Sequence, residues 1–271
     1  MKFDSNLAWR HASAAVLANR DVLLALAGVF FLLPRLALSL LLPDPPATQG
    51  SDPVVLAAAM EKFYGQMLPY LIPMVLFQGV GTLAILTLFT DRTRPTVGEA
   101  IKLGARGLLP YLGAQILFAL GATLVGGGLV MLAALSGSNA LVGAVGLVVV
   151  VAVIAVYVHL MLVAPVVAVE RVYQPFAALR RSWELTRGNA LRVLGFLLLI
   201  SMVAMVGLLA ALAVTSAAAA LIGGAEAVRV TNAVVSGVLG ALITLMMAAV
   251  LAAIHRQLAG PTAGDISATF E

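Results

Sequence analysis

The chain has 271 residues, of which 62% are hydrophobic and 10% are charged, and its mean hydropathy is +1.08. Soluble domains carry about 25% charged residues, so this composition excludes a soluble protein and indicates an integral membrane protein. Cysteine is absent, which excludes a disulfide framework and a thiolate metal site, and the net charge of +4 comes from basic residues beside apolar stretches, which favours lipid phosphates over nucleic acid as partners.

Six apolar stretches are each long enough, at about 20 residues, to cross a bilayer as a helix. They cover residues 22–42, 68–90, 109–135, 141–169, 190–221 and 233–255. The sequence therefore predicts an all-α fold, a six-helix transmembrane bundle formed by one domain over residues 1–260. A polar tail follows at residues 261–271, and we expect it to be disordered.

The basic residues are distributed unevenly between the two sides of this arrangement. Of the 16 Lys and Arg residues, all but Arg35, Lys62 and Arg229 fall on the side that also carries both termini. By the positive-inside rule this side is cytoplasmic, which predicts a multi-pass protein of the bacterial inner membrane with both termini in the cytoplasm.

A short basic amphipathic stretch precedes each odd-numbered span, at residues 5–20, 96–106 and 174–189. In the second stretch, Thr96 and Glu99 have the spacing of a capping box, and Pro110 stands where a separate helix can begin. These stretches predict interfacial helices before helices 1, 3 and 5. The recurring order suggests three repeats, at residues 1–90, 91–172 and 173–260, although basic loops on one side are common to all polytopic proteins.

The third stretch, residues 174–189, is named the elbow here. As a helix it has an apolar side and a charged side. The apolar side carries Phe176, Leu179, Trp183, Thr186 and Ala190, and the charged side carries Arg180, Arg181, Glu184 and Arg187. Its apolar arc suits the boundary between headgroups and acyl chains, and its arginines suit anionic phosphates. We expect the elbow to lie on the membrane surface between two spans.

Glu170 and Arg171 stand at the cytoplasmic end of the fourth span, just before the elbow. We expect the Glu170 carboxylate to pair with an elbow arginine and to hold the elbow against the bundle, which leaves the other guanidinium groups for phosphates. Gly188 is predicted to end the elbow helix and Asn189 to cap the next. A catalytic interpretation lacks a second carboxylate, a metal-binding set or a serine beside a histidine, so we expect no catalytic residue, metal or cofactor.

Polar side chains within the spans support an alternative. If Arg35, Gln78, Gln115 and His159 converge on a wet interior, the protein is a small transporter or channel, because polar groups at membrane depth are functional candidates by default. The competing interpretation is that Arg35 reaches to the membrane surface while the other three bond between helices.

The run APVVAVERVYQPFAALRRSWELTRGNALRVL, residues 164–194, resembles a segment of YciC-like bacterial inner-membrane proteins. It is also similar to the membrane domain that precedes the catalytic part of some bacterial glycerophosphodiester phosphodiesterases. The matching positions are Pro165, Glu170-Arg171, Ala178-Leu179, Ser182-Trp183, Leu185 and Gly188-Asn189. The resemblance implies a polytopic inner-membrane protein largely without assigned activity, and the phosphodiesterase chemistry belongs to a separate soluble domain that we do not expect here.

The leading hypothesis is a non-enzymatic inner-membrane protein with a lipid-binding or scaffold role in envelope maintenance. Its expected partners are anionic phospholipids, with a second copy or another membrane protein as a further possibility. The residues expected to contact headgroups or a partner are Glu170, Arg171, Arg180, Arg181, Trp183 and Arg187.

Overall fold

The computed structural model describes residues 2–41, 53–90 and 95–260, so the predicted tail lies outside the described residues. All regular elements in these residues are helical, which confirms the all-α prediction. Their order is α1 (Ser5–Ala18), α2 (Arg20–Ala27), the π-helical turn η1 (Gly28–Leu32), α3 (Leu33–Leu41), α4 (Pro53–Thr90), α5 (Val97–Gly121), the π-helical turn η2 (Ala122–Gly127), α6 (Gly128–Ala134), α7 (Asn139–Leu160), α8 (Val163–Val169), α9 (Pro175–Thr186) and α10 (Ala190–Ala259).

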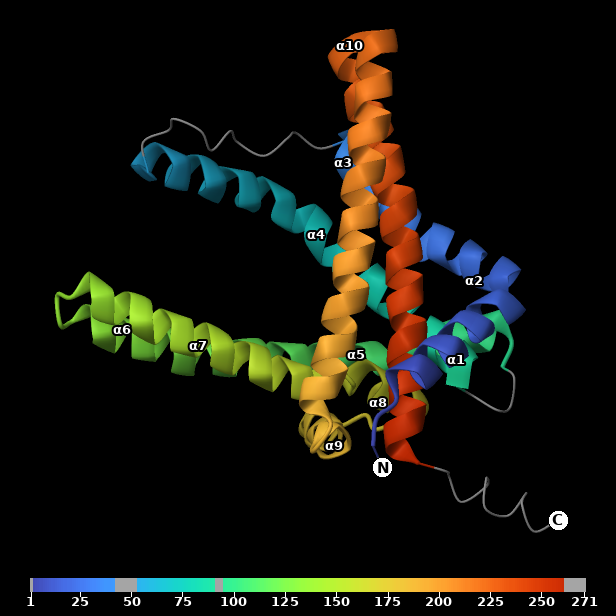
Figure 1. Ribbon diagram of the computed structural model, residues 1–271, viewed down its shortest axis with the longest axis horizontal. Helices are drawn as coiled ribbons and strands as arrows, with labels where there is room; N and C mark the ends of the chain where they lie inside the picture. The colour runs from blue at the N-terminus through green and yellow to red at the C-terminus, as the bar shows by residue number, and fades with distance from the viewer. Residues whose placement is uncertain (1, 42–52, 91–94, 261–271) are drawn as a thin grey trace.

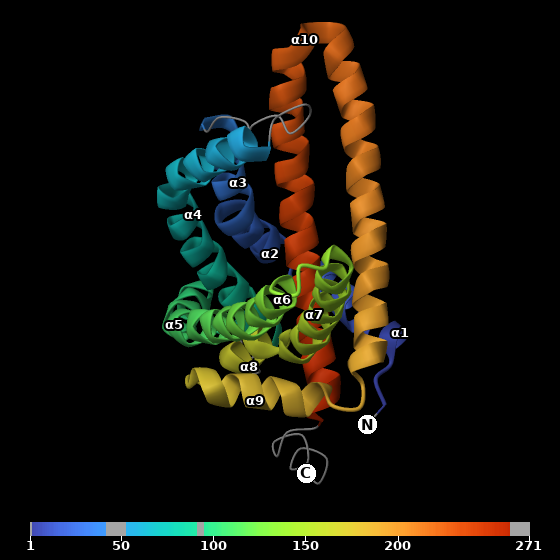
Figure 2. The ribbon, with the colours of Figure 1, turned by 90° about the vertical axis from the view of Figure 1, so that its left-hand side faces the viewer.

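The helices form three hairpins. The first runs out through α2, η1 and α3 and back through α4; the second runs out through α5, η2 and α6 and back through α7 and α8 (Figure 1). The third lies within α10, because Gly224 takes a φ of 68° and a ψ of −154° that only glycine adopts readily, and the helix reverses there. Figure 2 shows the two antiparallel arms of α10. Five stretches of the described residues are long and apolar enough to cross a membrane, the last of them being α10, so the protein is multi-pass.

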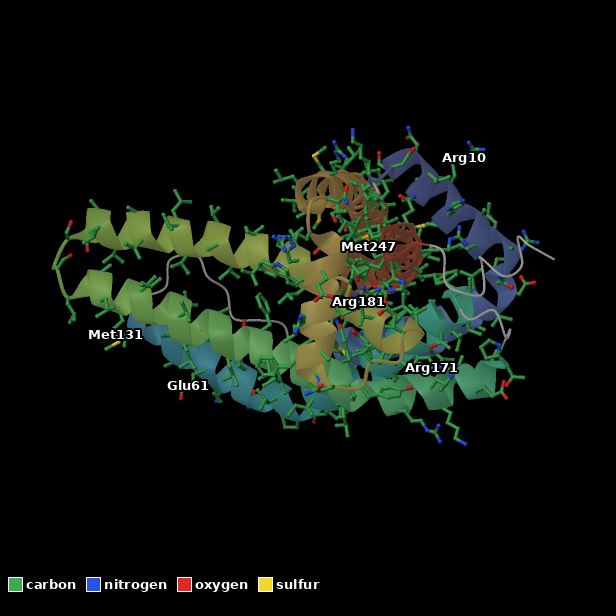
Figure 3. All side chains as sticks on the ribbon, turned by 90° about the horizontal axis from the view of Figure 1, so that it is seen from below. Arg10, Glu61, Met131, Arg171, Arg181 and Met247 are labelled. Atoms are coloured by element: carbon green, nitrogen blue, oxygen red, sulfur yellow. The ribbon has the colours of Figure 1, made fainter. Side chains whose placement is uncertain are left out.

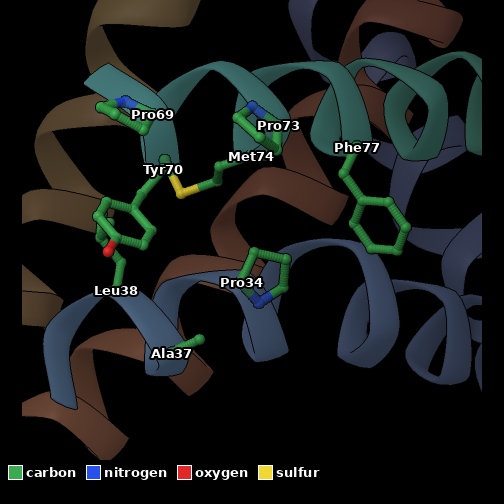
Figure 4. A pocket seen from close by; sticks show the side chains of 8 residues that line it. All are labelled: Pro34, Ala37, Leu38, Pro69, Tyr70, Pro73, Met74 and Phe77. Atoms are coloured by element: carbon green, nitrogen blue, oxygen red, sulfur yellow. The ribbon is translucent and has the colours of Figure 1, made fainter. Parts of the chain in front are cut away.

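Prolines shape the first hairpin. Pro34 has no N–H to donate to the Phe30 carbonyl, and the π-helical turn η1 ends two residues before it. Pro34 also lines a cavity of about 480 Å³ between α3 and α4, with Pro69 and Pro73 across from it (Figure 4). Next to the cavity, η1 packs against α4, and the rings of Phe30 and Phe77 lie 4.5 Å apart.

The buried core sits where the three hairpins meet, at the end of the molecule that carries the elbow. Fully buried side chains from α4, α8 and α10 pack together there, among them Leu83, Leu86, Val166, Val250 and Ile254. Further out the α6–α7 hairpin extends away from α10 (Figure 1), and only 6% of the most apolar window of residues 139–169 is buried. The spans therefore do not pack along their whole length as one bundle, because apolar side chains in a bilayer can be covered by lipid and need no protein partner.

The boundaries of two spans differ from the predictions. The sequence predicts a second span that begins at residue 68, but α4 already begins at Pro53. The predicted interfacial helix at residues 96–106 is not separate, because α5 continues through Pro110 into the third span. The capping box at its start is confirmed: the Thr96 hydroxyl accepts from the Glu99 N–H at 3.3 Å, and the Glu99 carboxylate accepts from the Thr96 N–H at 2.8 Å.

The helices α4 and α5 approach so closely that Gly104 has no room for a side chain. A Cβ atom at Gly104 would lie 2.8 Å from the Val80 carbonyl oxygen and 3.0 Å from the Ala84 nitrogen, and both of these are backbone atoms that cannot rotate away. Gly98, on the same helix, has nothing within 4 Å of the same position.

We predict that Gly104→Ala destabilises the protein while Gly98→Ala does not. The first change forces α4 and α5 apart, at a cost of about 1–3 kcal/mol, whereas the second adds only the higher helix propensity of alanine. Thermal unfolding of the purified variants in detergent measures the difference. Equal unfolding midpoints for the two variants would contradict the close approach.

Candidate functional site

The elbow helix α9 begins with Pro175 at its first turn and ends before Gly188, whose φ of +83° is the left-handed conformation predicted for the helix end. Its buried face agrees only in part with the predicted apolar side, of which Thr186 is buried and Phe176 is exposed. Small side chains at intervals of four residues, Ala178, Ser182 and Thr186, are buried, while Trp183 is 41% exposed. This spacing of small residues is the signal that could have revealed a face packed against other helices.

Two hydroxyl groups of α9 form hydrogen bonds with His159, near the end of α7. The helix α7 ends at Leu160, five residues before Pro165, and its last carbonyls have no partners within the helix. The Ser182 hydroxyl donates to the His159 carbonyl at 2.7 Å. The His159 ring stacks on Trp183 with 4.1 Å between ring centroids, and its Nδ1 lies 2.9 Å from the Thr186 hydroxyl.

Glu170 joins three segments of the chain. It follows α8, and one carboxylate oxygen accepts from Nε of Arg181 on α9 at 2.8 Å. The other oxygen lies 2.9 Å from Nε2 of His255, which is 3% exposed near the end of α10. The predicted pairing of Glu170 with an elbow arginine is therefore confirmed, and His255 is a partner that the sequence did not indicate.

The surroundings of Glu170 favour its charged form. Burial alone would raise the pKa of this carboxyl, but hydrogen bonds from His255 and Arg181, together with their charges, bring the pKa below its ordinary value of 4.5. The same hydrogen bond raises the pKa of Arg181, so its guanidinium stays charged. In the described part of the chain, no group of three or more His, Asp or Glu residues is placed to hold a metal ion.

A basic pocket with a volume of about 500 Å³ lies beside this ion pair, on the outer surface of the same end. The cationic side chains that line it come from the N-terminal segment, from α9 and the link after it, and from the first turn of α10; they are Lys2, Arg181, Arg187 and Arg192. Glu184 is the acidic residue among its lining residues. Figure 3, seen from this end, shows Arg181 on α9 next to the arms of α10, and Arg171 on the link between α8 and α9.

The N-terminal segment is held against the basic pocket by two amide side chains. The Asn189 side-chain oxygen accepts from the Phe3 N–H at 2.9 Å. Gln257 accepts from the Asp4 N–H at 3.2 Å and donates to the Asp4 carbonyl at 3.1 Å. Asn189 does stand before α10, but its side chain makes no cap, because it binds the N-terminal segment instead.

Three other predicted contact residues lie on the surface of this end. Arg180 is 3.0 Å from Glu184, one helical turn away, in an exposed ion pair. Arg171 is exposed and has a φ of 55°, the left-handed conformation in which a helix often ends. The Trp183 side chain is partly exposed, and its ring also stacks on His159.

Arg35, a candidate for an intramembrane site, packs against the second arm of α10. Its Nη2 lies 3.4 Å from the Thr244 hydroxyl, and its guanidinium occupies the space beside Gly240 that a side chain would fill. The small residues Gly240 and Thr244, four apart, thus let the arginine approach the helix backbone.

The other three candidates have different neighbours. Gln115 donates to the Tyr111 hydroxyl of its own helix at 3.1 Å, and His159 contacts α9. The side-chain nitrogen of Gln78 is buried without a hydrogen-bond partner among the described residues. No described hydrogen bond joins any two of these four candidates, and none of the four lines the basic pocket or the α3–α4 cavity.

Long apolar helices and a basic pocket at the end where they meet define a multi-pass membrane protein with a charged surface site. The chain belongs to the family described as a domain of unknown function, DUF7847, whose model matches residues 8–258. No curated protein and no solved structure shows significant similarity to it. The family match is to an uncharacterised family, and the resemblance to YciC-like proteins stays a prediction.

We predict that Glu170→Gln lowers stability far more than Glu184→Gln. Glu170 is 22% exposed and bonds two partners, so its loss leaves Arg181 and His255 poorly satisfied, at a cost of about 1–3 kcal/mol. Glu184 pairs with an arginine that is 84% exposed, and such surface pairs contribute about 0.5 kcal/mol or less. Thermal unfolding in detergent at neutral pH tests this, and similar midpoints for both variants would contradict a joining role for Glu170.

The contribution of Glu170 should also depend on pH. Because its pKa is lowered in the folded protein, the stability it provides is fully present above the ordinary value of 4.5 and is lost as the pH falls through the folded pKa. The gap between the unfolding midpoints of the unaltered protein and Glu170→Gln should therefore be full at neutral pH and shrink below pH 4.5. A gap that stays constant across this range would show that the carboxylate charge does not matter.

Proposed function

We propose that the protein is a non-catalytic, lipid-binding component of a bacterial inner membrane, and that its basic pocket holds the headgroup of an anionic phospholipid. The supporting observation is the pocket itself, where Lys2, Arg181, Arg187 and Arg192 surround a space of about 500 Å³. Guanidinium groups bind phosphate oxygens in pairs, which makes this lining suited to a phosphodiester. Holding such lipids at the junction of the hairpins is a scaffold role in envelope maintenance.

The position of the pocket suits a membrane surface. Two aromatic side chains of α9, Phe176 and Trp183, are 68% and 41% exposed, and Trp and Phe are typical of the apolar face of helices that lie in the membrane interface. Each arm of α10 is long enough to span, which gives six spans with both termini on the basic side. By the positive-inside rule that side is the cytoplasm.

The charged residues beside the pocket favour binding over catalysis. Glu170 has one oxygen on Arg181 and the other on His255, and it does not line the basic pocket. The alternative of a transporter would need Arg35, Gln78, Gln115 and His159 to face one cavity, and their different neighbours give it no support.

Arg181 is a poor target for a test, because its loss would also break the ion pair with Glu170. We therefore predict that the double variant Arg187→Gln, Arg192→Gln loses retention of anionic lipid. Each basic residue near an anionic surface contributes about 1 kcal/mol, so affinity for phosphatidylglycerol should fall about thirtyfold. Native mass spectrometry and titration in detergent measure retention and affinity.

The matched control is Lys102→Gln, Arg106→Gln, which removes the same charge from exposed positions on α5 outside the pocket. This control should bind phosphatidylglycerol like the unaltered protein. If the two double variants weaken binding equally, the attraction is a property of net charge, and the pocket is not the site.

A further inference from the structure

A second hollow lies next to the basic pocket, between the two arms of α10. It is an apolar groove with a volume of about 510 Å³, and the first turns of α1, which Figure 1 shows in front of the second arm, line one end of it. Its walls include Phe196 and Ile200 from the first arm and Ile243 and Met247 from the second. Polar groups enter only from the α1 end, where Ser5, Asn6 and Trp9 line it.

The groove and the basic pocket are neighbours along two segments of the chain. On α10, Arg192 lines the basic pocket and Phe196 lines the groove; they are four residues apart, so they share a helix face at a separation of about 6 Å. On the N-terminal segment, Lys2 lines the pocket and Ser5 lines the groove. Phe3 lies between them, with its ring 5.6 Å from that of Phe196.

The depth of the groove overlaps that of one leaflet of a bilayer. Its lining on the first arm runs from Phe196 to Ala204, which lie about 9–21 Å along the helix from Ala190. Half of a hydrocarbon core of about 30 Å is about 15 Å, so the groove begins within the leaflet next to the basic pocket and ends a few ångströms past its inner limit. Met246 and Met247 lie side by side in the wall, and flexible methionine side chains adapt to a chain of variable shape.

We propose that the groove between the arms of α10 holds an acyl chain of the same anionic phospholipid whose headgroup binds in the basic pocket. The inference rests on the proposed function, since the headgroup sets where the chain enters. The lipid then runs along the first turns of α10, with the headgroup at Arg192 and the chain beyond Phe196. The site therefore selects a lipid for two properties, a phosphate headgroup and a long apolar chain.

The protein offers a direct probe, because it has two tryptophans and only Trp9 lines the groove. In a Trp183→Phe background, Trp9 reports contact with a bromine-labelled chain through fluorescence quenching. We expect one equivalent of chain-brominated phosphatidylglycerol in detergent to quench Trp9, and brominated phosphatidylcholine at the same concentration to quench it far less. Equal quenching by both lipids would overturn the inference, since the chain would then enter without its headgroup.

Ala204→Phe fills the groove, and Leu198→Phe places the same ring on the outer face of the same arm, where Leu198 is 60% exposed. Affinity for dipalmitoyl phosphatidylglycerol should fall about tenfold or more in Ala204→Phe, because losing the burial of even two methylene groups costs that much. Affinity for dihexanoyl phosphatidylglycerol, which has the headgroup without a long chain, should stay unchanged. Leu198→Phe should match the parent for both lipids.

These outcomes separate the groove from the headgroup site. If Ala204→Phe keeps the parent's preference for the long chain, the groove is not the chain site, while the basic pocket stands. If the parent binds neither lipid, the proposed function fails with it. If the parent is a dimer that Ala204→Phe converts to a monomer, and Trp9 is not quenched, the groove is an interface between copies and the inference is wrong.

A milder variant covers the case in which Ala204→Phe does not fold. The chain has no cysteine, so Met247→Cys gives one thiol in the groove wall. Dipalmitoyl phosphatidylglycerol should slow its reaction with a methanethiosulfonate reagent, and dihexanoyl phosphatidylglycerol should not. Equal protection by both lipids, or by neither, would overturn the inference.

Discussion

The two-sided bonding of Glu170 is the contact on which the arrangement of the hairpins depends. Glu170 follows α8, where the negative end of the helix dipole disfavours a carboxylate unless cations face it. Arg181 and His255 supply those partners from positions 11 and 85 residues away in the chain. The α6–α7 hairpin extends away from α10 (Figure 1), so the contacts near Glu170 hold α8, α9 and the end of α10 together.

Local patterns in the sequence predicted the local features of the structure. Hydropathy predicted the apolar stretches, and the spacing of Thr96 and Glu99 predicted the capping box. The pairing of Glu170 with an elbow arginine was predicted because the elbow follows Glu170 closely in the sequence. His255 could not be predicted in the same way, because a histidine near the end of an apolar stretch has no local partner to reveal its role. The pairing depends on where α10 returns to the junction, and that is set by the turn at Gly224.

Tertiary contacts give two residues roles that differ from those their positions in the sequence predict. Asn189 stands where a helix cap belongs, yet its side chain binds the Phe3 N–H, because the extended N-terminal segment needs an acceptor there. Pro110 can begin a helix, yet α5 runs through it, and Gly104 lets the preceding turns pack on the backbone of α4. The basic pocket follows from the first of these contacts, since it places Lys2 beside the elbow.

Helix geometry divides the elbow arginines between two tasks. Neighbouring residues on a helix point about 100° apart, so Arg181 turns inward to Glu170 while Arg180 stays on the surface with Glu184. A partly buried pair is costly to break, whereas an exposed pair exchanges readily for a phosphate. In the proposed lipid site, Arg187 and Arg192 can therefore bind a phosphate while Arg181 keeps its bond to Glu170 and the junction stays intact.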